Sequence, residues 1–124
     1  MKTQESAENY LETILVLGQD GNKVRSIDIS TALNYAKPSV SVAMKKLRLD
    51  GYIEIDSSGY ITLTEKGQTI AKSMYERHML ISEWLTALGV DKQIAIDDAC
   101  RIEHVVSEQS FLAIKNHITN GRNI

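Results

Sequence analysis

The sequence has few of the residues that mark secreted, membrane-spanning or disulfide-rich proteins. Its 124 residues include one cysteine, one proline, one tryptophan and one phenylalanine. A single cysteine cannot form a disulfide framework, so a reducing compartment is the expected setting. No apolar run approaches the length of a transmembrane helix, and the polar start of the chain is unlike a signal peptide. We therefore expect a cytoplasmic globular protein without a membrane partner.

The sequence also lacks an excess of charge of either sign. It has 14 Lys and Arg residues and 16 Asp and Glu residues, which gives a formal net charge of −2. Overall charge therefore does not indicate nucleic-acid binding. The distribution of charge is uneven, because four cations and no acid lie between Lys37 and Arg48. Any binding of nucleic acid must depend on this segment.

The N-terminal half shows three short helical patterns followed by two β-rich runs. Ser6 can cap the first helix and Ser26 the second, while Pro38 suits the first position of the third. Residues 52–55 and 60–63 flank a polar turn, which predicts a β-hairpin. Three helices with a tight turn before the third, followed by a hairpin, are typical of a winged helix-turn-helix.

The C-terminal half is predicted to be entirely helical. Thr64, Asp91 and Ser107 can cap three further helices. These helices carry large apolar residues, such as Trp84 and Phe111, that need to be covered. A homodimer that buries them is the simplest expectation.

The third helix is the candidate DNA-recognition helix. Ser41, Lys45 and Arg48 share one face of it, away from the apolar positions. Small residues let a backbone approach the major groove, and the cations can bind phosphates. Charge runs are more often plain solvated faces, but the bracketing of this one by a turn, a proline and a hairpin favours DNA binding. The expected DNA-binding residues are Ser26, Lys37, Pro38, Ser39, Ser41, Val42, Lys45, Lys46 and Arg48.

The most distinctive segment is Asp97–Ser107, which places Cys100, Glu103 and His104 at positions i, i+3 and i+4. On a helix these side chains lie on one face, one turn apart. A thiolate, a carboxylate and an imidazole all bind divalent metals. Singly, each residue has another explanation: a lone cysteine is most often a small buried hydrophobe, and His104 could pair with an acid. Together at this spacing they predict a metal site.

Two other helices offer further ligands. His78 lies in the long fourth helix, which must pack near the fifth, and the first helix has Asn9 and Glu12 at i and i+3. The three helices could converge around one or two ions. The expected metal ligands are therefore Asn9, Glu12, His78, Cys100, Glu103 and His104.

These patterns predict a mainly α fold with two domains. Residues 1–64 are expected to form a winged helix-turn-helix DNA-binding domain, whose first helix also contributes metal ligands. Residues 65–124 are expected to form an all-helical metal-binding and dimerisation domain.

Several motifs resemble a known family, the metal-dependent repressors typified by the diphtheria toxin repressor and the manganese transport regulators. The likeness runs over nearly the whole chain, which is similar to the short, two-domain type. It includes the segments Glu8–Ile14, Lys37–Ser41, Leu49–Tyr52, Leu63–Gly67, Arg77–His78 and Ala99–His104.

The resemblance implies a cytosolic homodimer that binds double-stranded operator DNA when loaded with Fe(II) or Mn(II). Such a protein represses transcription and so controls metal-ion homeostasis. By position, His78, Cys100, Glu103 and His104 match family ligands, and Glu12 matches a ligand of the manganese branch. The Ala-Cys-Arg-x-Glu-His form is similar to the iron-responsive branch, since manganese regulators tend to carry Glu in place of the cysteine. Asn9 stands where the family has Met or Asp.

Three other functions are weighed against this one. A metal-independent winged-helix regulator could respond to a small organic ligand, and it would be distinguished by an operator affinity that a chelator does not change. An enzyme could use Cys100 and His104 as nucleophile and base, but nothing supplies an oxyanion hole or a substrate cleft. A metal buffer would leave the basic third helix unexplained. We therefore expect a regulator and not an enzyme.

Overall fold

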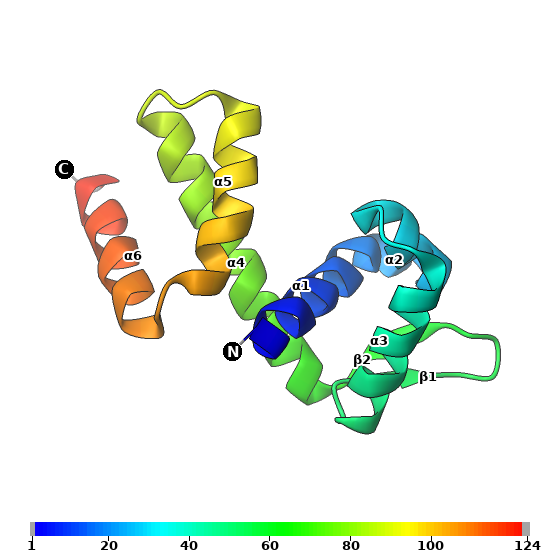
Figure 1. Ribbon diagram of the computed structural model, residues 1–124. Coiled ribbons are helices and arrows are strands. Elements are labelled where there is room, and N and C mark those ends of the chain that lie inside the picture. The colour runs from blue at the N-terminus through cyan, green and yellow to red at the C-terminus, as the bar shows by residue number, and fades with distance from the viewer. Residues whose placement is uncertain (1, 123–124) are drawn as a thin grey trace. The chain divides into compact units, whose positions relative to one another are not determined.

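The computed structural model describes residues 2–122, whose arrangement is shown in Figure 1. Helix α1 (Lys2–Leu17) is followed by a short 3-10 turn, α2 (Ser26–Leu33) and α3 (Lys37–Leu49). Strands β1 (Ile53–Ile55) and β2 (Ile61–Leu63) come next, and then α4 (Glu65–Ala87), α5 (Lys92–Val105) and α6 (Glu108–Arg122). The chain divides into two compact units between Ser73 and Met74, inside α4. The predicted mainly α fold, with a winged helix-turn-helix followed by helices, is confirmed.

The first unit contains α1, α2, α3, the hairpin and the start of α4. Strands β1 and β2 are antiparallel, with Ile53 opposite Leu63 and Ile55 opposite Ile61. Val24, which precedes α2, forms an isolated bridge with Ile61 and extends the small sheet. The buried apolar residues of α1, α2, α3 and the strands form one cluster, which includes Leu11, Ile14, Val24, Ile29, Val40, Met44, Leu47, Ile53 and Ile61.

The turn between α2 and α3 is fixed by local contacts. Asn34 has left-handed backbone angles, with φ 57°, which allows the chain to reverse after α2. The Ser30 hydroxyl donates a hydrogen bond of 2.6 Å to the Tyr35 carbonyl oxygen, and the Tyr35 ring packs edge-on against Tyr10. These contacts fix the turn that leads into α3.

The start of α4 is tied to the base of the hairpin. The Thr64 hydroxyl donates to the Gly51 carbonyl oxygen at 2.7 Å and accepts from the Gly67 amide at 3.2 Å. A Cβ atom on Gly67 would collide with the carbonyl oxygen of Tyr52. Only glycine therefore allows α4 to begin this close to the hairpin.

The second unit consists of the rest of α4 with α5 and α6. Ala95 and Ala99 are fully buried on α5, and their small side chains allow α5 to lie close to a neighbouring helix. The Asp91 carboxylate accepts hydrogen bonds from the amides of Gln93 and Ile94 at the start of α5. The Ser107 hydroxyl accepts one from the Ser110 amide at the start of α6. Within the described residues, no helix combines the length and the apolar character needed to cross a membrane.

Three of the predicted helix caps, Thr64, Asp91 and Ser107, are confirmed. The two earliest are wrong. Helix α1 begins at Lys2, so Ser6 lies inside it. Helix α2 begins at Ser26 and is capped from Arg25, whose amide donates to the Asp28 carboxylate at 2.9 Å. An acidic residue at the third helical position supplied the cap that serine was expected to provide.

Candidate metal centre and nucleic-acid interface

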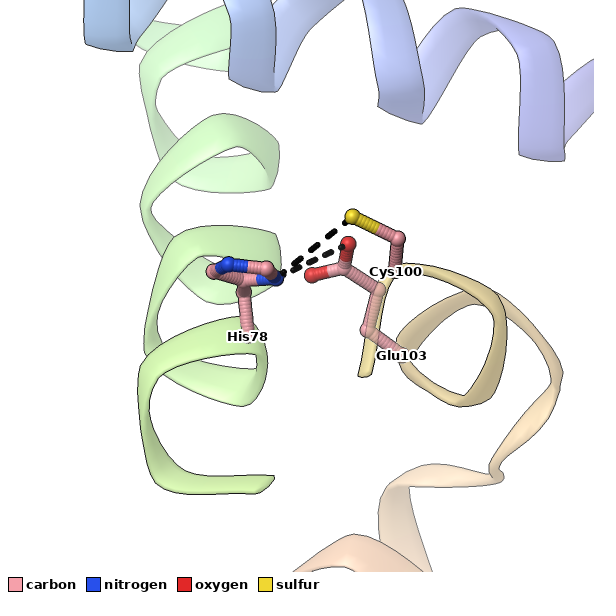
Figure 2. Close-up of side chains that lie close together, drawn as sticks. All are labelled: His78, Cys100 and Glu103. Atoms are coloured by element: carbon pink, nitrogen blue, oxygen red, sulfur yellow. Dashed lines mark hydrogen bonds and ion pairs between the residues drawn. The ribbon is translucent and has the colours of Figure 1, made fainter. Parts of the chain in front are cut away.

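Three chemically different side chains meet between α4 and α5 in the second unit (Figure 2). The Nδ1 atom of His78 lies 3.8 Å from the Sγ atom of Cys100 and 3.7 Å from the Oε1 atom of Glu103. Cys100 and Glu103 are one turn apart on α5, so both can face the same residue of α4. The three ligand atoms lie within 4.8 Å of one another, a spacing that one cation can bridge.

A second imidazole lies beside the same carboxylate. The Nε2 atom of His104 is 3.7 Å from Glu103 Oε1, the oxygen that also faces His78. Glu103 therefore lies between two histidines from different helices. We refer to His78, Cys100, Glu103 and His104 as the ligand cluster, and its binding of a metal stays a prediction.

The buried carboxylate suits a cation. Glu103 is only 1 % exposed, and its Oε2 atom has no hydrogen-bond partner among the described residues. A buried charged oxygen without a partner is costly, so a divalent ion would relieve this cost. The combination of thiol, imidazole and carboxylate matches the ligands that first-row divalent metals use. The residues present therefore fit the group that the sequence predicts.

The cluster also affects the protonation of His78. Its hydrogen bond with the Cys100 sulfur, and then its close contact with the Glu103 carboxylate, raise the pKa of His78 to about 10, although burial acts in the opposite direction. The imidazole therefore holds a proton at neutral pH in the metal-free protein. An ion that binds through His78 Nδ1 must displace this proton.

The two remaining predicted ligands lie on α1, in the first unit. Asn9 and Glu12 are one turn apart on this helix, and the Asn9 carbonyl oxygen accepts a hydrogen bond of 2.8 Å from the Thr13 hydroxyl. Their participation in a metal site stays a prediction that rests on sequence.

Helix α3 presents the predicted recognition face to solvent. Val40, Met44 and Leu47 are buried in the core of the first unit, so the other faces of the helix point outward. Val42, an apolar residue on this basic surface, is 70 % exposed. Ser26 is half-buried at the start of α2. All other residues of the predicted DNA-binding set are exposed: Lys37, Pro38, Ser39, Ser41, Val42, Lys45, Lys46 and Arg48.

The structure reveals two further cations that the sequence pattern did not single out. The Lys23 ammonium lies 4.8 Å, and the Arg25 guanidinium 4.6 Å, from the centre of the Tyr60 ring at the hairpin. Both distances are within the range of cation–π contacts. The bridge between Val24 and Ile61 brings these segments together, and this pairing was not visible in the sequence. The alternation of Lys23 and Arg25 around an apolar residue was the available signal.

Arg77 was also missed as a functional candidate, although it directly precedes His78. It is only 6 % exposed, and its guanidinium contacts main-chain atoms at the end of α5. An arginine next to a predicted ligand is the signal that could have identified it.

Comparison with protein families gives two matches that together span most of the chain. Residues 2–60 match the iron dependent repressor N-terminal DNA binding domain. Residues 64–122 match the iron dependent repressor metal binding and dimerisation domain.

Curated relatives of similar length agree with these matches. The chain is 33% identical over 113 residues to an HTH-type transcriptional regulator of Methanocaldococcus jannaschii, covering 90% of both chains. It is 32% identical over 112 residues to the transcriptional regulator MntR of Escherichia coli, covering 90% of this chain and 72% of the relative. It is 35% identical over 109 residues to MntR of Bacillus pumilus, covering 88% and 76%.

Solved structures share the fold. The manganese regulator SloR superposes with a TM-score of 0.81 at 29% identity, over 91% of this chain and 53% of that one. A manganese-dependent transcriptional repressor in complex with manganese gives a TM-score of 0.84 at 26% identity, over 91% and 52%. The chain thus spans about half the length of these two solved proteins.

Proposed function

Because this chain belongs to the iron-dependent repressor family, we propose that it is a transcriptional repressor that binds operator DNA when loaded with Fe(II) or Mn(II) and so controls metal-ion homeostasis. The observation that carries this proposal is the meeting of three side chains: His78 Nδ1 lies 3.8 Å from Cys100 Sγ and 3.7 Å from Glu103 Oε1, and the other oxygen of the buried Glu103 carboxylate, Oε2, has no hydrogen-bond partner among the described residues. The exposed basic face of α3 supports the DNA-binding part of the proposal, because its cations can contact DNA phosphates.

In this proposal, residues 1–64 form the DNA-binding domain, and residues 65–124 form the domain that binds metal and dimerises. The family matches, which end at residue 60 and begin again at residue 64, support this assignment. The proposed ligands are His78, Cys100, Glu103 and His104, joined by Asn9 and Glu12 on the strength of the sequence match. A bound divalent ion supplies the positive charge that the buried Glu103 carboxylate lacks. The cluster residues hold that ion between α4 and α5.

The proposed DNA interface is centred on α3. Ser39 and Ser41 are small enough for the backbone to approach a major groove, and exposed Val42 can contact a thymine methyl group. Lys45, Lys46 and Arg48 are suited to phosphates, as Lys37 is at the start of the helix, and so they provide affinity more than sequence choice.

We extend this interface to Lys23 and Arg25. A groove between α3 and the hairpin is lined in part by Arg48 and Tyr60, so the end of the recognition helix and the Tyr60 ring share one surface. Glu54 and Asp56 also line this groove, and the Asp56 carboxylate accepts hydrogen bonds from the Ser58 and Tyr60 amides within the hairpin turn. The two cations over Tyr60 add positive charge beside the recognition helix and can make additional phosphate contacts.

We propose that the protein acts as a homodimer in the cytoplasm. Phe111, which the sequence predicted that a dimer would bury, is already buried within the chain. The second unit exposes other large apolar side chains, among them Leu88, Ile94, Val105 and Leu112, which a partner subunit would cover. A twofold dimer would read two half-sites about one turn of DNA apart, roughly 34 Å. We propose no catalytic role for Cys100, since its sulfur lies in a group of metal-type ligands.

Operator binding measured by gel shift against Fe(II), Mn(II), Co(II) and Zn(II), with a chelator control, tests the proposal. We expect tight binding with Fe(II) or Mn(II) and loss of binding with chelator. A demetallated protein that bound the operator as tightly as the loaded protein would refute the proposal and favour a regulator that responds to an organic ligand.

A further inference from the structure

Arg77 is a buried cation whose partners all lie at the junction of α5 and α6. Its Nη1 atom donates hydrogen bonds to the carbonyl oxygens of Glu103, at 3.0 Å, and Val106, at 2.6 Å. Its Nη2 atom lies 3.6 Å from the Glu108 carboxylate, and its guanidinium lies 5.2 Å from the centre of the Phe111 ring. One side chain of α4 therefore contacts the end of α5 and the start of α6.

The two carbonyl groups belong to the part of a helix that needs external partners. The last carbonyls of an α-helix have no amide donor within the helix, and the helix dipole places negative charge there. Helix α5 ends at Val105, so the carbonyl groups of Glu103 and Val106 lie at this end. A guanidinium is suited to both needs, since it supplies several donors and a permanent positive charge.

The same contacts place Arg77 directly behind the ligand cluster. Helix α4 presents His78 to the Glu103 carboxylate and the preceding residue, Arg77, to the Glu103 main chain. Glu103 is thus held at its side chain and at its backbone by consecutive residues of one helix. His104, the next residue along α5, lies on the same segment.

Rigid support matters for this cluster because a metal site needs its ligands in place before the ion arrives. Residues that orient ligands without touching the ion commonly change metal affinity by 10- to 100-fold when they are replaced. The Nε atom of Arg77 is buried without a hydrogen-bond partner among the described residues, which costs free energy that the contacts of Nη1 and Nη2 must offset.

We propose that Arg77 is the positioning residue of the metal centre: by holding the carbonyl groups of Glu103 and Val106, it fixes the end of α5 that carries Glu103 and His104 in the geometry that binds the ion. This inference rests on the proposed function. It assigns to Arg77 no contact with the ion and no contact with DNA.

The test measures the affinity of the 124-residue protein for Mn(II) by calorimetry, in Arg77→Gln and in two matched controls. Lys115→Gln removes the exposed 2.7 Å ion pair between Lys115 on α6 and Glu76 on α4. Phe111→Leu removes the ring beside the guanidinium but no hydrogen bond. The second control reports how much affinity is lost through local loosening alone.

We expect Arg77→Gln to weaken Mn(II) binding about 10- to 100-fold, and both controls to stay within about twofold of the wild type. In the metal-free protein, hydrogen exchange of the amides of residues 104–110 should be faster in Arg77→Gln than in Phe111→Leu. Arg77→Lys keeps the charge, but its single ammonium cannot serve both carbonyl groups and Glu108 at once, so its affinity should lie between those of the wild type and Arg77→Gln.

An Arg77→Gln protein that binds Mn(II) within about threefold of the wild type would overturn the inference. Equal weakening in Arg77→Gln and Phe111→Leu would also overturn it, because the effect would then be general loosening. If Arg77→Gln does not fold, an Arg77→Lys protein that binds Mn(II) with wild-type affinity would overturn the inference instead. A wild-type protein that failed to bind Fe(II) or Mn(II) would instead refute the proposed function itself.

Discussion

Replacing Glu103 by glutamine should separate the stability of the metal-free protein from its response to metal. The change keeps the shape of the side chain and removes one buried negative charge. In the metal-free protein that charge lies 3.7 Å from the protonated imidazole of His78. At an effective dielectric constant of about 20, two unit charges at this distance attract by about 4 kcal/mol.

This attraction is offset by the cost of burying the carboxylate. Removing an ion from water costs several kcal/mol, and Glu103 Oε2 recovers none of this cost through a hydrogen bond within the described residues. The two terms nearly cancel, and we expect the free energy of unfolding of metal-free Glu103→Gln to stay within about 1 kcal/mol of the wild type.

The response to metal should differ much more. At a Mn(II) concentration of about 1,000 times Kd, binding stabilises the folded wild type by about 4 kcal/mol. Loss of the only buried carboxylate of the ligand cluster should weaken Kd about 100-fold, and at the same Mn(II) concentration the stabilisation falls to about 1.4 kcal/mol. Thermal melting with and without Mn(II), followed by circular dichroism, measures both quantities in one experiment.

Two results would refute this reasoning. A Glu103→Gln protein whose melting temperature rises with Mn(II) as much as that of the wild type would remove Glu103 from the metal centre. A metal-free variant that melted more than about 10 °C below the wild type would show that the carboxylate stabilises the apo protein, contrary to the balance of charge attraction and desolvation. Gln93→Ala, at an exposed position of the same helix, is the control for non-specific effects of substitution in α5.

Three further substitutions test the two binding surfaces. Lys45→Ala should weaken binding to all DNA sequences alike and lower the slope of log affinity against log salt by about 0.9, and a loss confined to the operator would contradict a phosphate contact. Lys23→Ala should lower the same slope without changing the preferred sequence, and an unchanged slope would remove the cations over Tyr60 from the interface. Cys100→Glu should shift preference from Fe(II) toward the harder Mn(II) in a competition titration, and an unchanged ratio would exclude Cys100 as the selecting ligand.

The sequence was most informative where short-range spacing determines the structure. Cys100, Glu103 and His104 could be placed on one helical face because a helix repeats every 3.6 residues. Thr64, Asp91 and Ser107 could be identified as caps because a side-chain oxygen there meets amides only two or three residues away.

The contacts that escaped prediction join residues far apart in the chain. Arg77 donates to carbonyl groups 26 and 29 positions away along the chain. Every residue has a main-chain carbonyl group, so the sequence does not indicate which of them a side chain contacts. The positions of the cations over Tyr60 depend on the pairing of Val24 with Ile61. This bridge is a single residue pair, which is too short to produce the alternating pattern that identifies a strand in a sequence. The error at the start of α2 had a different origin, since Ser26 and Asp28 were both able to cap it and only the folded backbone selects between them.

The different surroundings of Glu103 and Cys100 suggest how one scaffold can serve different ions. The glutamate is buried, lies between two histidines and is held through its main chain by Arg77. The cysteine, one turn earlier, is exposed, and its sulfur lies 3.8 Å from His78 Nδ1. Every divalent ion needs the negative charge, whereas the softness of the remaining ligand distinguishes one ion from another. In the proposed metal centre, the fold would thus fix the ligand that all candidate ions share and leave the selective ligand at an exposed position, where its replacement disturbs the least packing.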